Sequence, residues 1–191
     1  MNLLPFIMYT FLITMTPDPT NIDILNTIRN KGLKGGIQYT YGAITAFVFL
    51  LIISTVVNIF LSEKMPSFLL FMKLIGSIYI LYLIYTLFRK HSENKVENDI
   101  GTFYSGFALQ FLNPKVVTFT MTVIPTFVLV NQPSTLMISI YVIMTSIIAL
   151  ISFSFWIFFG TLLKTFIQKH EMIVNITMAL FLLYAAIIVW V

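Results

Sequence analysis

The sequence predicts an all-α polytopic membrane protein with six transmembrane helices, arranged as two inverted three-helix repeats in which the first and fourth helices are broken. Three observations predict this fold. Of the 191 residues, 59% are hydrophobic and only 9% are charged, whereas about 25% are charged in an ordinary soluble domain. Six apolar stretches are each long enough for the roughly 20 residues that cross a bilayer core. Prolines with polar neighbours interrupt the first and the fourth of these stretches.

The six stretches belong to a single transmembrane domain, residues 1–191, with three stretches in each half. They cover about residues 3–28, 37–61, 67–88, 102–130, 135–163 and 172–191. The first lacks a basic n-region and a small-residue cleavage site, so we expect a retained span rather than a signal peptide. The polar segment 91–101 reads as a cytoplasmic linker between halves 1–90 and 102–191. Because each half has an odd number of spans, a repeat must have inverted topology.

The distribution of Lys and Arg predicts the orientation, because short cytoplasmic loops retain positive charge. The second loop contributes only Lys64 and the fourth contributes none. The other three loops together hold eight such residues: Arg29, Lys31, Lys34, Arg89, Lys90, Lys95, Lys164 and Lys169. Both termini are therefore expected outside. This distribution accounts for the net charge of +4, and the sequence gives no evidence of nucleic-acid binding.

The break in the first stretch reads Thr16-Pro17-Asp18-Pro19-Thr20-Asn21. Each proline removes a backbone donor and clashes with the preceding turn, so a helix cannot continue through the pair. Such irregular backbone survives at membrane depth only where protein buries it or where it lines a watery cavity. Asp18 adds roughly 2.5 to 3.5 kcal/mol of insertion cost, which makes it a functional-site hypothesis. Asp23 follows closely and either joins this site or simply caps the resumed helix.

The break in the fourth stretch reads Gln110-Phe111-Leu112-Asn113-Pro114-Lys115. Lys115 is a cation at a depth that corresponds to that of Asp18, so a site between the halves would let the two pair or share water. Alternatively, Lys115 snorkels to the cytoplasmic face and Pro114 merely kinks a helix. Half-helix N-termini attract a carboxylate, and unwound carbonyls attract an ammonium, so an amino acid fits the pair of breaks.

The predicted substrate and proton pathway therefore combines both breaks. Its residues are Thr16, Pro17, Asp18, Pro19, Thr20, Asn21, Asn113, Pro114 and Lys115, with Asp23, Gln110, Tyr79 and Tyr82 as further candidates. The two tyrosines recur at helical spacing and otherwise serve as packing. Gly42 and Gly106 lie in small-residue pairs that suit close helix contact.

Several function classes are excluded or disfavoured. The chain has no cysteine, which removes disulfides, thiolate ligands and thiol redox relays. His91 and His170 lie in basic loops without a carboxylate pair on a common face, so we expect no metal site. No Gly-rich run ending in Gly-Lys-Ser/Thr occurs, and no nucleophile-and-base set is visible. We therefore expect neither an enzyme nor a cofactor, and an ion gradient or a partner must supply the energy.

The chain resembles the lysine exporter (LysE/RhtB) family of bacterial amino-acid exporters over nearly its full length. The resemblance rests on three motifs in order: Thr16-Pro17-Asp18-Pro19-Thr20-Asn21 followed by Arg29-x-Lys31-Gly32, then Lys73-x-x-Gly76-x-x-Tyr79-x-x-Tyr82, then Phe111-Leu112-Asn113-Pro114-Lys115. The family usually has Thr-Pro-Gly-Pro in the first motif, so Asp18 stands in the glycine position and Thr20 replaces a common Asn. Aspartate brings charge and restricts the backbone freedom that glycine would give.

The resemblance implies export of an amino acid or derivative across the bacterial inner membrane, driven by the proton gradient, with basic, hydroxylated, sulfur-containing and branched substrates known in the family. We expect alternating access in which Asp18 exchanges a proton and Lys115 pairs with it or holds the substrate carboxylate. The expected partners are the substrate, a coupling proton, the bilayer and, as one option, a second copy in a homodimer. Two alternatives are a cation or metal exporter, since Asp18 and Asp23 are hard ligands, and a non-transporting membrane subunit.

Overall fold

A computed structural model describes residues 3–60, 101–129 and 134–188, together with individual positions between 74 and 88. All regular structure in these residues is helical, which confirms the all-α prediction for this part of the chain. Tyr79 and residues 91–100 of the expected linker lie outside the described residues.

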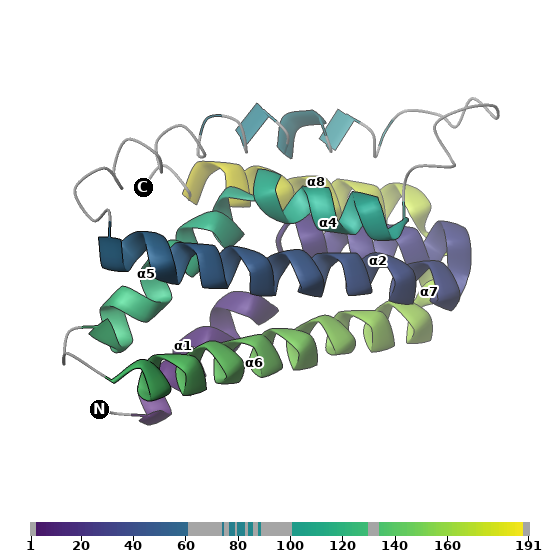
Figure 1. Ribbon diagram of the computed structural model, residues 1–191. Coiled ribbons are helices and arrows are strands. Elements are labelled where there is room, and N and C mark those ends of the chain that lie inside the picture. Colours follow the sequence, from purple (N-terminus) through teal and green to yellow (C-terminus); the bar gives the residue numbers. More distant parts are fainter. Residues whose placement is uncertain are drawn as a thin grey trace.

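Helices α1 (Leu3–Met15) and α2 (Pro19–Phe60) are separated by the first proline motif. Pro19 opens α2 at the position where a missing N–H costs nothing. The 42 residues of α2 would extend for about 63 Å as one straight helix, about twice the thickness of a bilayer core. Gly32, with φ 73° and ψ −173°, interrupts it, and the chain doubles back there (Figure 1). The loop expected between residues 28 and 37 is thus reduced to one non-helical residue.

Helices α4 (Phe103–Leu112) and α5 (Pro114–Phe127) meet at the second proline motif with a bend of 67°. Thr102 opens α4 with a capping box that includes the Ser105 side chain, which satisfies two otherwise unpaired N–H groups. Asn113 ends α4 and caps α5, and Pro114 is the first residue of α5. The direction of the chain therefore changes at a single residue whose side chain stabilises the second helix.

The last three helices are α6 (Thr135–Leu162), α7 (Lys164–Lys169) and α8 (Glu171–Ile188). Ser134 caps α6 through the Met137 amide. Among the described residues, α2 (counted as Pro19–Ile59) and α6 are long and apolar enough to cross a membrane, and the bent pair α4 and α5 makes a third if it is counted as one span. Helix α1 and the Glu171–Tyr184 part of α8 are shorter apolar helices.

The returning part of α2, residues 33–60, packs against α4 and α6. Its contact with α4 is close enough to exclude side chains: a Cβ at Gly42 would collide with the Phe103 carbonyl, and a Cβ at Gly106 would collide with the Tyr39 carbonyl. Small residues allow backbones to approach in this way, so the close contact expected at these two glycines is confirmed.

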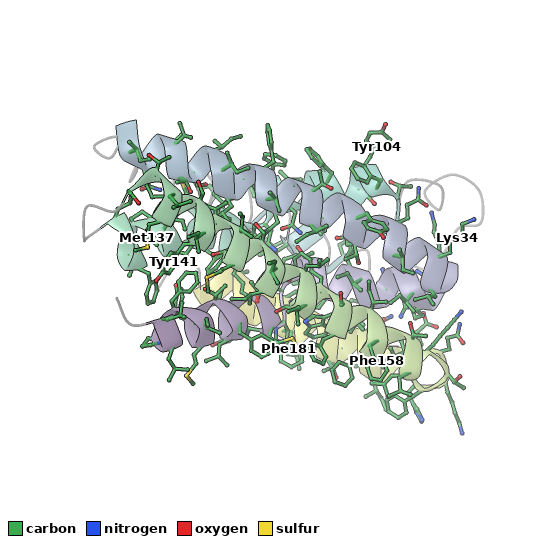
Figure 2. All side chains as sticks on the ribbon, turned by 60° about the horizontal axis from the view of Figure 1, so that its bottom comes forward. Lys34, Tyr104, Met137, Tyr141, Phe158 and Phe181 are labelled. Carbon is green, nitrogen blue, oxygen red and sulfur yellow. The ribbon has the colours of Figure 1, made fainter. Side chains whose placement is uncertain are left out.

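The two ends of the helical bundle differ in composition. Figure 1 shows the start of α1, the end of α2, the start of α6 and the end of α8 at one end, and the Gly32 bend, the start of α4 and α7 at the other. Figure 2 places Lys34 at the latter end, opposite Met137 and Tyr141. We call this second end the basic end. The described basic residues that the bend and α7 bring to it are Arg29, Lys31, Lys34, Lys164 and Lys169.

Two buried apolar clusters flank the helix interruptions. One includes Ile24, Tyr39 and Leu109, and the other includes Phe6 and Phe119. Each proline motif is preceded along the chain by residues of one cluster and followed by residues of the other. The polar residues of the motifs are therefore held between two packed cores.

Candidate functional site

The two helix interruptions meet around the carboxylate of Asp18, which is only 3% exposed. Its Oδ1 accepts a hydrogen bond from the Asn21 backbone N–H at 2.8 Å, which is the contact of a helix N-cap. Its Oδ2 accepts one from Asn113 Nδ2 at 3.1 Å and lies 3.7 Å from Lys115 Nζ. One carboxylate thus starts α2 and joins it to the start of α5.

Lys115 also binds the backbone that the first break exposes. Its Nζ donates to the Thr16 carbonyl at 2.7 Å, and its side chain is 18% exposed. Asn21 Nδ2 donates to the carbonyls of Thr14 and Thr16 at 3.1 Å each. Carbonyls at the end of a helix have no partner within the helix, and these side chains supply one. The ammonium of Lys115 therefore lies between the Asp18 carboxylate and the Thr16 carbonyl. This position would suit any primary ammonium group.

Thr20, Gln110 and Asn113 form the second part of the site, and all three are completely buried. Thr20 Oγ1 accepts hydrogen bonds from Gln110 Nε2 and from Asn113 Nδ2, each at 3.1 Å. Asn113 Oδ1 accepts from the backbone N–H groups of Lys115 at 3.1 Å and Val116 at 3.4 Å. Asn113 therefore uses both ends of its amide to fasten α5 to the first break.

Two buried acceptors in this network lack a hydrogen-bond donor among the described residues. They are Asn21 Oδ1 and Gln110 Oε1. A buried oxygen without a donor costs about 1 to 3 kcal/mol, and such groups in native proteins usually face water or a ligand. The site can therefore accept two further N–H or O–H donors.

Most of the residues expected from the sequence are brought together. Thr16, Asp18, Thr20, Asn21, Gln110, Asn113 and Lys115 belong to the network above, and Pro17, Pro19 and Pro114 lie at the helix ends that shape it. Asp23 lies one turn further along α2, where the Tyr39 side chain lies near its carboxylate. Tyr82 is 52% exposed, which places it at the surface of the described bundle.

Two polar contacts were not foreseen from the sequence. Thr14 Oγ1 lies 2.8 Å from Ser152 Oγ, which ties the first break to α6. Arg29, expected in a short cytoplasmic loop, is 8% exposed, and its Nη1 donates to Asn175 Oδ1 at 2.7 Å. Its Nη2 donates to Asn26 Oδ1 at 2.7 Å. Asn26 and Arg29 are three residues apart, a spacing that places side chains side by side on a helix, so this second bond could have been predicted from the sequence.

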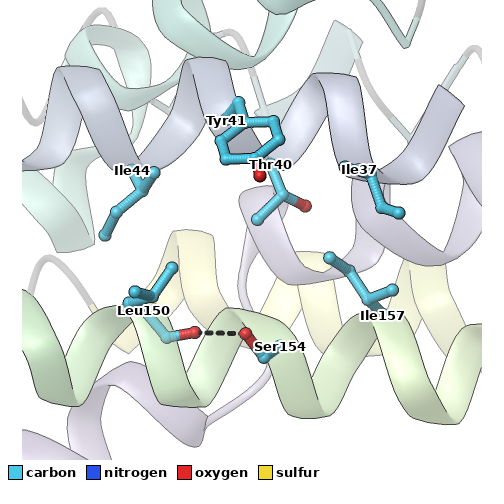
Figure 3. Close-up of a pocket in the computed structure, with 7 residues that line it drawn as sticks. All are labelled: Ile37, Thr40, Tyr41, Ile44, Leu150, Ser154 and Ile157. Carbon is cyan, nitrogen blue, oxygen red and sulfur yellow. Dashed lines mark hydrogen bonds between the residues drawn. The ribbon is translucent and has the colours of Figure 1, made fainter. Parts of the chain in front are cut away.

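A separate groove lies between the returning part of α2 and α6, with a volume of about 300 Å³ (Figure 3). Its lining is mainly aliphatic, and three of its side chains carry hydroxyl groups, those of Thr40, Tyr41 and Ser154. The Ser154 hydroxyl donates to the Leu150 carbonyl of its own helix at 2.8 Å. The groove shares no residue with the network around Asp18.

Comparison with known proteins agrees with the sequence resemblance. A family model described as LysE type translocator matches residues 11–191. A cysteine/O-acetylserine efflux protein of Klebsiella pneumoniae subsp. pneumoniae is 27% identical over 184 residues, which cover 95% of this chain and 93% of the relative. The protein of the same description from Escherichia coli (strain K12) is 27% identical over 184 residues, covering 94% and 92%. No solved structure matches the chain significantly.

Proposed function

The chain belongs to the family of LysE type translocators, and on this basis we propose that it exports a small, electrically neutral amino acid or amino-acid derivative from the cytoplasm by antiport with protons. It is a transporter rather than an enzyme. The observation that carries the proposal is the buried pair of Asp18 and Lys115 between two helix interruptions. Relatives named for cysteine and O-acetylserine efflux make these two compounds the first substrates to test.

The charges of the site favour a zwitterion. Asp18 and Lys115 together carry no net charge. A substrate ammonium can take the place of the Lys115 ammonium beside Asp18 and the Thr16 carbonyl, and the released Lys115 can then hold the substrate carboxylate. A basic amino acid would leave an extra buried cation without a partner, which is costly. The open acceptors Asn21 Oδ1 and Gln110 Oε1 are available to further substrate N–H groups or to a hydroxyl.

The arrangement of the described helices supports an orientation for this export. The basic end carries Arg29, Lys31, Lys34, Lys164 and Lys169, so the positive-inside rule assigns it to the cytoplasm. The start of α1 and the end of α8 lie at the opposite end (Figure 1). We propose six spans with both termini outside, in which α1 with the first part of α2, and α4 with α5, are the two broken spans.

The proposed cycle is alternating access around the two breaks. In the substrate-free state Lys115 neutralises Asp18. Substrate enters from the cytoplasm, separates this pair and leaves on the outer side, after which a proton from outside returns through Asp18 to the cytoplasm. Exchange of the ion pair for substrate contacts gives the two open states different affinities for substrate, which any coupled carrier needs.

Inside-out membrane vesicles with an acid interior test the proposal. Labelled cysteine under reducing conditions and labelled O-acetylserine are compared with lysine, threonine and leucine, with and without a protonophore. Accumulation of a small neutral compound that collapses with the protonophore is expected, and vesicles without the protein are the control. Failure of every amino acid to accumulate, although the protein is in the membrane, would refute the proposal and direct the test to inorganic cations. Preference for lysine would refute the charge argument.

A further inference from the structure

A polar stripe runs along the first part of α2, from the site to the basic end. Thr20, Asp23, Thr27 and Lys31 follow one another at intervals of three, four and four residues, a spacing that places side chains on one face of a helix. Thr20 is 0% exposed and Thr27 is 1% exposed. Asp23 is partly buried between them and Lys31 is exposed, so the stripe leads from the buried site to the surface at the basic end.

Both ends of the stripe are fixed by contacts with the second half of the chain. At one end, Thr20 Oγ1 accepts the hydrogen bonds from Gln110 and Asn113 described above. At the other, Gly101 packs so tightly against the side chains of Thr27 and Lys31 that a Cβ there would meet both. The stripe therefore connects the site around Asp18 to the end of the molecule assigned to the cytoplasm.

Asp23 lies between these ends. The Tyr39 side chain, on the returning part of α2, lies near its carboxylate. Among the residues that the structure describes, the ion pairs are those of Asp18 with Lys115 and Arg29 with Glu171, so Asp23 has none. A carboxylate at membrane depth without a cation is costly in its charged form. Binding a proton removes that cost, and losing it to water restores the charge.

Unpaired oxygens occur on both sides of Asp23. Gln110 Oε1 is buried near Thr20, and Thr27 Oγ1 is buried between Asp23 and Lys31, each without a donor among the described residues. Buried oxygens of this kind are the usual partners of internal water. Water beside each oxygen would complete a chain of exchangeable protons from the site through Asp23 to the basic end.

We propose that this stripe conducts the coupling proton from the site to the cytoplasm, with Asp23 as the group that accepts and releases it. The proposal rests on the antiport function proposed above. The proton passes from Asp18 to the Asp23 carboxylate and then to cytoplasmic water at the Thr27 and Lys31 end, and no other bond forms or breaks. The described ionisable groups beside this part of the stripe are Asp18 and Lys31 on the same segment and Tyr39 on the returning part of α2, whereas α4 contributes the neutral Gln110.

Two transport modes separate the route of the proton from the binding of substrate. Counterflow exchanges labelled for unlabelled substrate without a pH gradient and needs no net proton transfer. Accumulation driven by an acid interior needs one in every cycle. Asp23→Asn should lower gradient-driven accumulation by at least about tenfold, because an amide cannot take up the proton, and should leave counterflow within about twofold. Asp23→Glu should restore accumulation because it keeps the carboxyl group.

Glu171→Gln is the matched control, because it removes a carboxylate from the basic end outside the stripe, where its side chain is 64% exposed. It should change neither mode. Full gradient-driven accumulation by Asp23→Asn would overturn the proposal, and so would loss of counterflow, since Asp23 would then belong to substrate binding or to the fold. These results presuppose an active unsubstituted protein; no transport by that protein would instead refute the proposed function.

Discussion

Removal of one member of the Asp18 and Lys115 pair should destabilise the protein more than removal of both. Lys115 Nζ lies 3.7 Å from Asp18 Oδ2, which corresponds to an attraction of about 4.5 kcal/mol at an effective dielectric constant of about 20. The Lys115 side chain keeps 18% of its exposure, so water screens part of this attraction. Breaking a buried pair by removing one partner typically costs about 3 to 5 kcal/mol, and we expect about 3 kcal/mol for Lys115→Met and for Asp18→Asn.

A double-mutant cycle measures the pair itself. The free energy of unfolding is determined in mixed micelles by titration with a denaturing detergent for the parent, Lys115→Met, Asp18→Asn and the double variant. Because the double variant buries no unpaired charge, its loss should be smaller than either single loss, and so smaller than their sum by about 3 kcal/mol or more, at the upper end of the range for coupled neighbours. Additive losses would refute the reasoning that the two charges stabilise each other. Both single variants should also lose gradient-driven transport while still inserting.

Three further substitutions test the framework around the site. Asn113→Ala should cost about 2 kcal/mol or more in free energy of unfolding, because it removes the cap of α5 together with the bonds to Asp18 and Thr20. The control Ser134→Ala removes an exposed cap and should cost less than about 1 kcal/mol in the same unfolding assay. Equal losses would contradict this prediction. Gly106→Ala should destabilise the protein by an amount at the upper end of the usual overpacking range of about 1 to 3 kcal/mol, since the new Cβ meets a backbone carbonyl. Gly160→Ala should cost less, because its new Cβ meets movable side-chain atoms of Leu25 and Ile28. The reverse order of thermal stability would contradict the close contact of α2 and α4. Gly32→Ala should cost about 1 to 3 kcal/mol through backbone strain, because φ 73° with ψ −173° is a conformation that only glycine adopts readily. A steric clash adds nothing, since the nearest atom to a Cβ there is Lys164 Nζ at 3.7 Å; an unchanged unfolding midpoint would contradict the positive φ.

The positions where helices end could be predicted from the sequence because the signals are local. Proline removes a donor wherever it occurs, and Asp or Asn next to it offers a cap. Helix α1 accordingly ends at Met15, just before Pro17, and α5 begins at Pro114. The same local reasoning was less accurate between residues 28 and 37. Leu, Lys and Arg there are good helix formers, so the chain stays helical on both sides of Gly32.

Contacts between distant residues could be predicted only in part. The expectation that Asp18 and Lys115 share a site came from the cost of two isolated charges in a membrane, and the structure brings them to 3.7 Å. Neutral groups carry no comparable signal. The hydroxyls of Thr14 and Ser152 meet across 138 residues, yet serine and threonine can satisfy themselves on their own helix, as Ser154 does. Their partners depend on packing that the sequence pattern does not reveal.

Asp18 in the position where the family usually has glycine is explained by the contacts of its two oxygens. Glycine is a weak N-cap with no side-chain acceptor, whereas Asp18 Oδ1 binds the Asn21 N–H and so stabilises the start of α2. Oδ2 remains for Asn113 and Lys115. With glycine there, the Lys115 ammonium would keep only the Thr16 carbonyl and would bind a substrate carboxylate without first leaving a carboxylate of the protein. Under the mechanism proposed above, the substrate competes with Lys115 for Asp18 in this chain, so that binding and separation of the charged pair become one event. In the proposed cycle, Asp18 becomes free to accept the proton from outside after the substrate has left and before Lys115 returns to it.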